Sequence, residues 1–93
     1  MTRRTDATMV WVHDENGSGL HADGAARVSV LDHGFTVADG VFETLKVERG
    51  MVFALQRHLS RLQRSSAAMG LPEPDLSAIE SAVEATVAAN AAS

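Results

Sequence analysis

The chain has 93 residues, of which 45% are apolar, and its formal net charge is −4. A chain of this length can form one small core, but it buries only about 60–65% of its unfolded surface, so a partner would add stability. The acidic balance argues against nonspecific nucleic-acid binding, which needs a basic surface. The absence of cysteine excludes disulfides and thiolate metal sites. No stretch has the pattern of a membrane span or an export signal, so we expect a cytoplasmic location.

The first third of the chain has the pattern of short strands joined by turns. Residues 1–8 are polar and unpatterned, which predicts a loose tail. Residues 9–13 are rich in β-branched and aromatic side chains, and the following Asn-Gly turn predicts a hairpin with a return segment at residues 20–22. Apolar and polar residues alternate at residues 27–31, which predicts a further strand.

The clearest alternation lies between Val41 and Glu48, where we expect a strand. Successive side chains of a strand point to opposite faces. One face is apolar and holds Val41, Leu45 and Val47. The other face has the composition of a polar ligand-pocket wall and holds Phe42, Thr44, Lys46 and Glu48. Glu43 interrupts the apolar face and needs a hydrogen-bonding partner if it is buried.

A turn at Arg49 and Gly50 predicts a second hairpin, and from Leu55 the hydrophobic period becomes that of a helix. The apolar stripe of this helix holds Leu55, Leu59, Leu62, Ser66 and Met69. A separate basic stripe holds Arg57, Arg61 and Arg64. Gly70 and Pro72 predict the end of the helix.

A second helix is predicted next, because Ser77 and Glu80 have the spacing of a capping box. Its buried face is expected to hold Leu76, Ile79, Val83 and Val87. Residues 88–93 are mostly alanine, and we expect no cap at that end. The order of elements predicts one α+β domain over residues 9–93, with a mostly antiparallel sheet built from two hairpins and a strand, followed by two helices packed on one face.

Two segments carry a family resemblance. They are VLDHGFTVADGVFETLKVERG at residues 30–50 and His-Leu-Ser-Arg-Leu at residues 58–62. Together they resemble the N-terminal part of the class IV (fold-type IV) pyridoxal-phosphate enzymes, which include branched-chain aminotransferases, D-amino-acid aminotransferases and 4-amino-4-deoxychorismate lyases. The resemblance implies an α+β small domain, pyridoxal 5'-phosphate as cofactor, and a homodimer with its active site between domains. It also implies a longer protein with a second, lysine-bearing domain that is absent from this chain.

The resemblance assigns a cofactor-binding role to Arg61. In the family, the arginine of the His-x-x-Arg-Leu segment holds the phosphate of pyridoxal phosphate, and a guanidinium group suits phosphate oxygens because it presents a rigid fork of donors. Without the resemblance, Arg61 would be interpreted as a solvated arginine, like Arg57 and Arg64.

The resemblance also assigns a substrate-binding role to Phe42, Thr44 and Lys46. They match the stretch whose alternate residues line the substrate side of the cofactor in class IV enzymes. The alternative is a strand face open to solvent. Phenylalanine at position 42, where D-specific members tend to have tyrosine, weakens the assignment to D-amino acids.

We expect no catalytic residue in this chain. Lys46 is its only lysine, and it does not match the lysine that binds the cofactor covalently in the family, so the 93-residue chain is predicted to be inactive alone. Asp32 and His33 are interpreted as structural loop residues, and Ala38 departs from the glycine frequent at that position. The histidines have no metal-ligand spacing, which predicts no metal site.

The first functional hypothesis is the N-terminal part of a class IV aminotransferase of amino-acid metabolism that acts on an amino acid and an oxo acid. The alternative within the family is a 4-amino-4-deoxychorismate lyase of the folate pathway. A non-catalytic domain that assembles with another chain is the alternative from a different class, and a structural domain without a ligand is a further one. The expected partners are a small-molecule amino-acid substrate and either a second copy or the missing domain, without nucleic acid or membrane.

Overall fold

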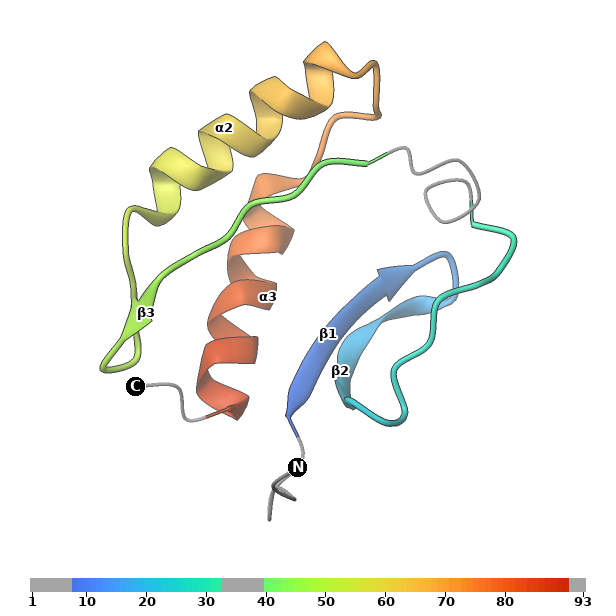
Figure 1. Cartoon of the computed structure of the whole chain (residues 1–93), viewed down its shortest axis with the longest axis vertical. Helices are drawn as coiled ribbons and strands as arrows, with labels where there is room; N and C mark the ends of the chain where they lie inside the picture. The colour runs from blue at the N-terminus through green and yellow to red at the C-terminus, as the bar shows by residue number, and fades with distance from the viewer. Residues whose placement is uncertain (1–7, 33–39, 91–93) are drawn as a thin grey trace, which may run out of the picture.

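The computed structural model describes residues 8–32 and 40–90 of the chain. Its elements are β1 (Met9–Asp14), β2 (Gly17–Ala22), β3 (Val47–Glu48), β4 (Met51–Val52), α2 (Leu55–Ala68) and α3 (Leu76–Ala89). Helix α3 packs against α2 and against β1, so it occupies the middle of the molecule (Figure 1). The predicted α+β class, with two antiparallel hairpins followed by two helices, is confirmed.

The first hairpin forms as predicted from its turn residues. β1 and β2 pair antiparallel along their whole length, from Met9 opposite Ala22 to Asp14 opposite Gly17. The Asp14 side chain accepts a hydrogen bond from the Asn16 N–H at 2.9 Å, which closes the turn. Gly17 has a φ of 133°, a conformation that residues with a Cβ rarely adopt.

The second hairpin also has the predicted turn. β3 and β4 pair antiparallel, with Val47 opposite Val52 and Glu48 opposite Met51. The two turn residues, Arg49 and Gly50, have φ values of 53° and 75°. Positive φ at both central residues matches the turn to the right-handed twist of the flanking strands, which is why a glycine is favoured there.

The strand predicted over residues 27–31 is not formed. This stretch is a loop with a turn at Val30 and Leu31, and the Asp32 N–H donates to the Ser29 carbonyl at 3.1 Å. A strand needs a neighbour that satisfies its backbone groups, and among the described residues no strand pairs with this stretch. The alternation in the sequence was therefore insufficient for a strand.

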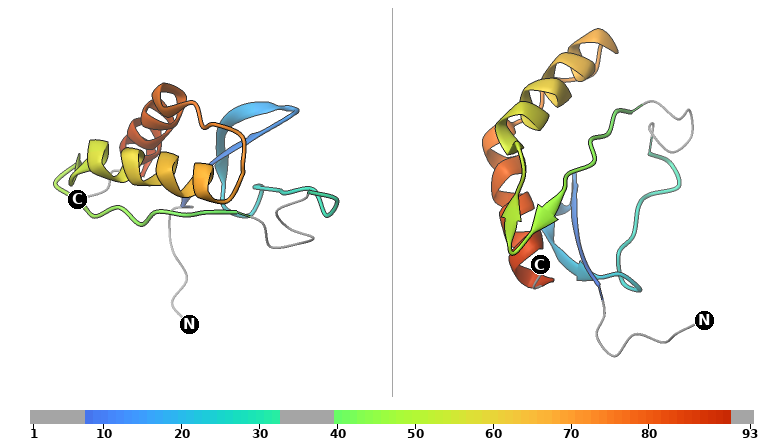
Figure 2. Two further views of the ribbon diagram at one scale, coloured as in Figure 1. Left: turned by 90° about the horizontal axis from the view of Figure 1, so that it is seen from above. Right: turned by 60° about the vertical axis from the view of Figure 1, so that its left-hand side comes forward.

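The strand predicted from Val41 to Glu48 forms only in part. Its last two residues are β3, while residues 40–46 form an extended segment that runs alongside α2 (Figures 1 and 2). The Lys46 carbonyl accepts a hydrogen bond from the Phe53 N–H at 2.9 Å, which continues the second hairpin by one position. Within the described residues the strands form two separate two-stranded sheets instead of one sheet.

Helix α2 begins and ends where the sequence predicts. After Ala68 the chain reverses at Gly70, which has a φ of 70°, and the Leu71 N–H donates to the Ser66 carbonyl at 2.9 Å. The predicted apolar stripe faces inward, because Leu59 and Ser66 are both buried. Met69 departs from the prediction and is half exposed, since it lies beyond the last residue of the helix.

Helix α3 has different ends from those predicted. Its N-cap is Asp75, not Ser77, and the Asp75 side chain accepts a hydrogen bond from the Ala78 N–H at 3.0 Å. A carboxylate is the stronger choice at this end, because it accepts from a free N–H and also carries the charge that the helix dipole favours.

The C-terminal end of α3 is capped, contrary to the prediction. Asn90 Nδ2 donates to the carbonyls of Met9 and Thr86 at 3.0 and 2.8 Å, and Asn90 Oδ1 accepts from the Met9 N–H at 2.8 Å. One side chain therefore ties the end of α3 to the start of β1. The predicted tail ends at Thr8, and its first seven residues lie outside the described part of the chain.

The core of the described part is small, and Leu59, at 5% exposure, is its one buried apolar side chain. One polar contact joins the two helices at their surfaces, and a second joins α2 to the loop before α3. Gln56 Nε2 donates to Glu80 Oε1 at 2.5 Å, and Gln63 Nε2 donates to Glu73 Oε1 at 3.2 Å. Among the described residues, no helix combines the length and apolar character needed to cross a membrane.

Candidate functional site

The extended segment before β3 has two distinct faces. From Val41 to Glu48 the side chains alternate between half-buried and exposed at every position. The exposed face carries the predicted substrate-binding residues together, namely Phe42, Thr44 and Lys46. Phe42 is 85% exposed, so its ring is available to a ligand or to another surface. The prediction that these three residues share one face is confirmed.

Lys46 makes two contacts at the end of this exposed face. Its Nζ lies 3.8 Å from Glu48 Oε2 and 5.1 Å from the centre of the Phe53 ring. Both charged side chains are largely in water, at 73% and 51% exposure, so the ion pair holds Lys46 only weakly. The ammonium group therefore stays accessible to a polar ligand.

Glu43 lies on the opposite, half-buried face of the segment. Its side chain is only 15% exposed, and its Oε1 is 2.6 Å from His58 Nδ1 and 3.6 Å from Arg61 Nη1. The expectation that a buried Glu43 would need a partner is confirmed. A carboxylate can only accept hydrogen bonds, so His58 Nδ1 must carry the hydrogen.

Arg61 has one anchored edge and one open edge. Its Nη1 lies at ion-pair distance from Glu43, and its side chain remains 56% exposed. Within residues 8–32 and 40–90 its guanidinium has no second ion-pair or hydrogen-bond partner, so its other N–H groups face water. A guanidinium held on one side and free on the other fits the phosphate of a cofactor.

The other two arginines of the basic stripe are placed differently. Arg57 and Arg64 are exposed on α2, and neither forms an ion pair in the described part of the chain. Only Arg61 is reached by the Glu43 carboxylate. This geometry distinguishes Arg61 from its two neighbours, while the cofactor-binding role expected from the His-x-x-Arg-Leu segment stays a prediction.

The structure does not bring all the predicted site residues together. Arg61 meets the extended segment through Glu43, whereas Phe42, Thr44 and Lys46 lie on the opposite face. The chain thus presents two candidate surfaces on either side of one extended segment. Of the two predicted sites, the cofactor site at Arg61 is the one supported by a specific contact, the ion pair with Glu43.

Sequence reasoning did not identify the partner of Arg61. His58 is included in the family segment and excluded as a metal ligand, but it is not paired with Glu43 there, although His58 stands three residues before Arg61 and residues at that spacing are neighbours on a helix surface. Glu43 was recognised as needing a partner that was not named. The inward face of the segment and the helical spacing together contained the missing signal.

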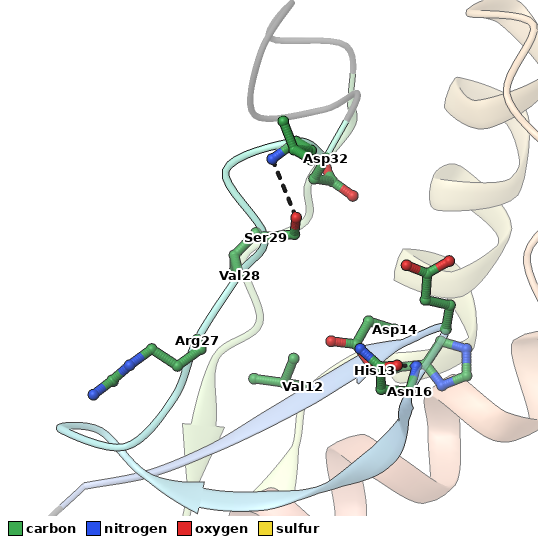
Figure 3. A pocket seen from close by; sticks show the side chains of 10 residues that line it. Val12, His13, Asp14, Asn16, Arg27, Val28, Ser29 and Asp32 are labelled. Atoms are coloured by element: carbon green, nitrogen blue, oxygen red, sulfur yellow. Dashed lines mark hydrogen bonds between the residues drawn. The ribbon is translucent and has the colours of Figure 1, made fainter.

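A separate hollow of about 610 Å³ lies between the end of β1 and the loop before residue 33 (Figure 3). Figure 3 shows Arg27 and Asp32 on the loop side of the hollow and His13 and Asp14 on the β1 side, with the Arg27 side chain directed away from β1. None of the predicted site residues lines it. Among the described residues, no three histidine or carboxylate side chains are arranged to hold a metal ion. His33 and Ala38, noted in the sequence, lie outside the described residues.

Comparison with known proteins gives a family match over more than half of the chain. The sequence profile described as Amino-transferase class IV matches residues 40–93. This range includes the exposed face, the Glu43 contacts and all of α2.

Two relatives are similar over 65 and 44 residues of this chain. A bifunctional aminodeoxychorismate lyase / D-amino acid transaminase of Mycobacterium tuberculosis is 46% identical over 65 residues, which is 70% of this chain and 20% of the relative. A D-alanine aminotransferase of Bacillus licheniformis is 36% identical over 44 residues, or 47% of this chain and 16% of the relative.

A solved structure, that of a fold IV transaminase from Curtobacterium pusillum, has a TM-score of 0.78 and 42% identity, and the match covers 90% of this chain and 31% of that one. The chain therefore spans between about one sixth and one third of the length of these proteins.

Proposed function

Because this chain belongs to the amino-transferase class IV family, we propose that it is the N-terminal small domain of a pyridoxal-phosphate-dependent aminotransferase acting on an amino acid and an oxo acid. One observation carries the proposal: Arg61, at the family's arginine position, is anchored by Glu43 and keeps its remaining donors open to water. When bound, the cofactor supplies an electron sink for bond breaking next to the amino group.

Arg61 is proposed to hold the cofactor phosphate. Its guanidinium offers two parallel N–H donors to two phosphate oxygens, and such charge-assisted bonds are about twice as strong as neutral ones. The half-exposed position lets a ligand approach without moving a helix. No other arginine on α2 has this combination of an anchor and an open edge in the described residues.

Phe42, Thr44 and Lys46 are proposed to line the substrate side. An aromatic ring packs on an apolar side chain or on a ring edge, while a hydroxyl and an ammonium group bind polar groups of a small acid. All three are exposed on one face. They lie across the segment from Arg61, so a ligand that meets both surfaces has to reach around the segment.

The same exposed face supports a proposal about assembly. Phe42 is joined by Met51 and Phe53 among the exposed large apolar side chains. Apolar surface of this kind marks a surface that another structure covers. We propose that a second, lysine-bearing domain or a second copy of the chain covers it, in a homodimer. A cytoplasmic location stays a prediction.

A 4-amino-4-deoxychorismate lyase is the second candidate. A specific observation favours it: the relative from Mycobacterium tuberculosis is named as both an aminodeoxychorismate lyase and a D-amino acid transaminase. The same phosphate contact at Arg61 serves either reaction, because both use the cofactor in the same way. The choice between the two depends on substrate contacts, which the exposed face supplies only in part.

Cofactor titration by absorbance tests the proposed function in the protein with its second domain present. Arg61→Ala should weaken pyridoxal-phosphate binding about ten- to hundredfold, because a hydrogen bond to a charged group contributes about 1.5–3 kcal/mol. Arg57→Ala is the matched control, since Arg57 lies on the same helix, is exposed and has no ion pair among the described residues. Equal losses in the two variants would show that Arg61 is ordinary surface charge.

A further inference from the structure

We propose that Glu43 is a positioning residue: its carboxylate, fixed by His58, orients Arg61 so that the open edge of the guanidinium faces the phosphate of the cofactor. This inference rests on the proposed function and adds a role for two residues. The observation behind it is one carboxylate oxygen shared by two donors, with His58 Nδ1 at 2.6 Å and Arg61 Nη1 at 3.6 Å.

The three side chains differ in how firmly they are held. Glu43 and His58 are mostly buried, at 15% and 22% exposure, whereas Arg61 is 56% exposed. Glu43 stands on the inner face of the extended segment, between the half-buried Val41 and Leu45. A carboxylate in this position is costly unless it is paired, so it keeps its partners. The fixed member of the group is therefore Glu43, and the member that is oriented is Arg61.

His58 makes the carboxylate a fixed point instead of a mobile one. It lies in the first turn of α2, three residues before Arg61, so its contact with Glu43 joins the extended segment to the helix that bears the arginine. The contact also selects the imidazole tautomer, because Nδ1 must carry the hydrogen that the carboxylate accepts. Nuclear magnetic resonance can therefore detect the contact from the tautomer of the His58 ring.

The anchor is positioned to help cofactor binding by reducing its entropic cost. A free arginine side chain has many rotamers, and ordering them on binding opposes affinity. Glu43 restricts Arg61 from one edge only, since the 3.6 Å separation is an ion pair and leaves the remaining donors free. Part of the ordering is then complete before the ligand arrives.

The negative charge of Glu43 acts in the opposite direction, because it repels a phosphate. Two donors already face this charge, and the phosphate would approach from the water-exposed side of Arg61. Charges separated by several ångströms and exposed to water interact weakly, and salt screens them further. We therefore expect orientation to outweigh repulsion, with a net gain of about tenfold in affinity.

Two substitutions at position 43 separate orientation from charge and from folding. Glu43→Met keeps the side-chain length, suits the apolar neighbours and offers at most a weak acceptor. It leaves His58 and Arg61 without the carboxylate, but these side chains are 22% and 56% exposed and can bond to water. Glu43→Gln removes the charge but keeps an oxygen that accepts from His58 and that Arg61 Nη1 can reach by a small shift from its present 3.6 Å. If Glu43 acts by orienting Arg61, the glutamine variant should order Arg61 and bind the cofactor like the wild type, and the methionine variant should not.

The first measurement uses nuclear magnetic resonance on the 93-residue chain. In the wild type, Arg61 Nε should be more ordered than Arg57 Nε and Arg64 Nε, and the His58 ring should carry its hydrogen on Nδ1. Glu43→Met should remove both signatures, and Glu43→Gln should keep them. If Arg61 is as mobile as the other two arginines in the wild type, the inference is overturned, even if neither variant folds.

The second measurement is affinity in the protein with its second domain present. Glu43→Met should weaken pyridoxal-phosphate binding about tenfold, Glu43→Gln should stay within about threefold of the wild type, and pyridoxal, which lacks the phosphate, should bind all three proteins alike. Unchanged or tighter phosphate binding by Glu43→Met overturns the inference. If the wild type binds no cofactor at all, the proposed function fails, while the resonance measurement still decides whether Glu43 orients Arg61.

Discussion

The extended segment beside α2 and the loop that follows β2 have similar sequence patterns but different structures. Both showed alternating apolar and polar residues, at 41–48 and at 27–31. Beside α2 the alternation of exposure is retained at every position, whereas Val28, Val30 and Leu31 are all exposed. The first stretch has a helix to pack on, through the Glu43 contact to His58. Alternation therefore predicts which side chains share a face, but a buried face also requires a partner.

The largest test of this comparison removes one leucine from each region. Leu59→Ala should destabilise the chain by about 2–4 kcal/mol, because Leu59 is 5% exposed and its loss leaves a cavity. Leu31→Ala should change the unfolding free energy by less than about 0.5 kcal/mol, because Leu31 is 85% exposed. Urea denaturation followed by circular dichroism measures both. A comparable loss at Leu31 would mean that the loop is packed in solution.

The features that the sequence predicts correctly depend on short-range interactions, and the features that it does not predict depend on long-range ones. The turn at Arg49 and Gly50 and the stop at Gly70 were predictable, because each depends on the backbone preference of one or two residues. The helical stripe was predictable because its period is local. The ion pair between Arg61 and Glu43 and the hydrogen bonds between Asn90 and Met9 join residues 18 and 81 positions apart, and the pattern within one element does not specify such pairs.

The next prediction concerns the link between the end of α3 and the start of β1. Asn90→Ala removes three partly buried hydrogen bonds, two to Met9 and one to Thr86. At a typical net value near 1 kcal/mol each, partly replaced by water, we expect a loss of about 1–3 kcal/mol. Hydrogen exchange should show earlier opening of β1 than of α2 in this variant.

Asn16→Ala is the matched control for Asn90→Ala, because only the backbone N–H of Asn16 bonds to Asp14. It should cost less than about 0.5 kcal/mol. An equal effect from the two asparagines would contradict the idea that Asn90 joins α3 to β1.

A smaller effect distinguishes the two candidate caps of α3. Asp75→Ala should cost about 1 kcal/mol, since the carboxylate accepts the Ala78 N–H and lies at the positive end of the helix. Ser77→Ala should be close to neutral, because Ser77 is exposed within the first turn of the helix and does not cap it. Thermal unfolding of the two variants ranks the caps, and a larger loss at Ser77 would restore the capping box predicted from the sequence.

The smallest expected effect is that of Lys46 on stability, and it sharpens the view of the exposed face. Its ion pair with Glu48 spans 3.8 Å between side chains that are 73% and 51% exposed. Such pairs contribute at most about 0.5 kcal/mol and weaken in high salt, so Lys46→Ala should leave the unfolding free energy nearly unchanged. Lys46→Arg is the control that keeps the charge.

If Lys46 binds a ligand, Lys46→Ala should weaken substrate binding in the protein with its second domain while the melting temperature stays constant. A parallel loss of stability and binding would instead make Lys46 a structural residue, and the exposed face would then lose its only cationic group.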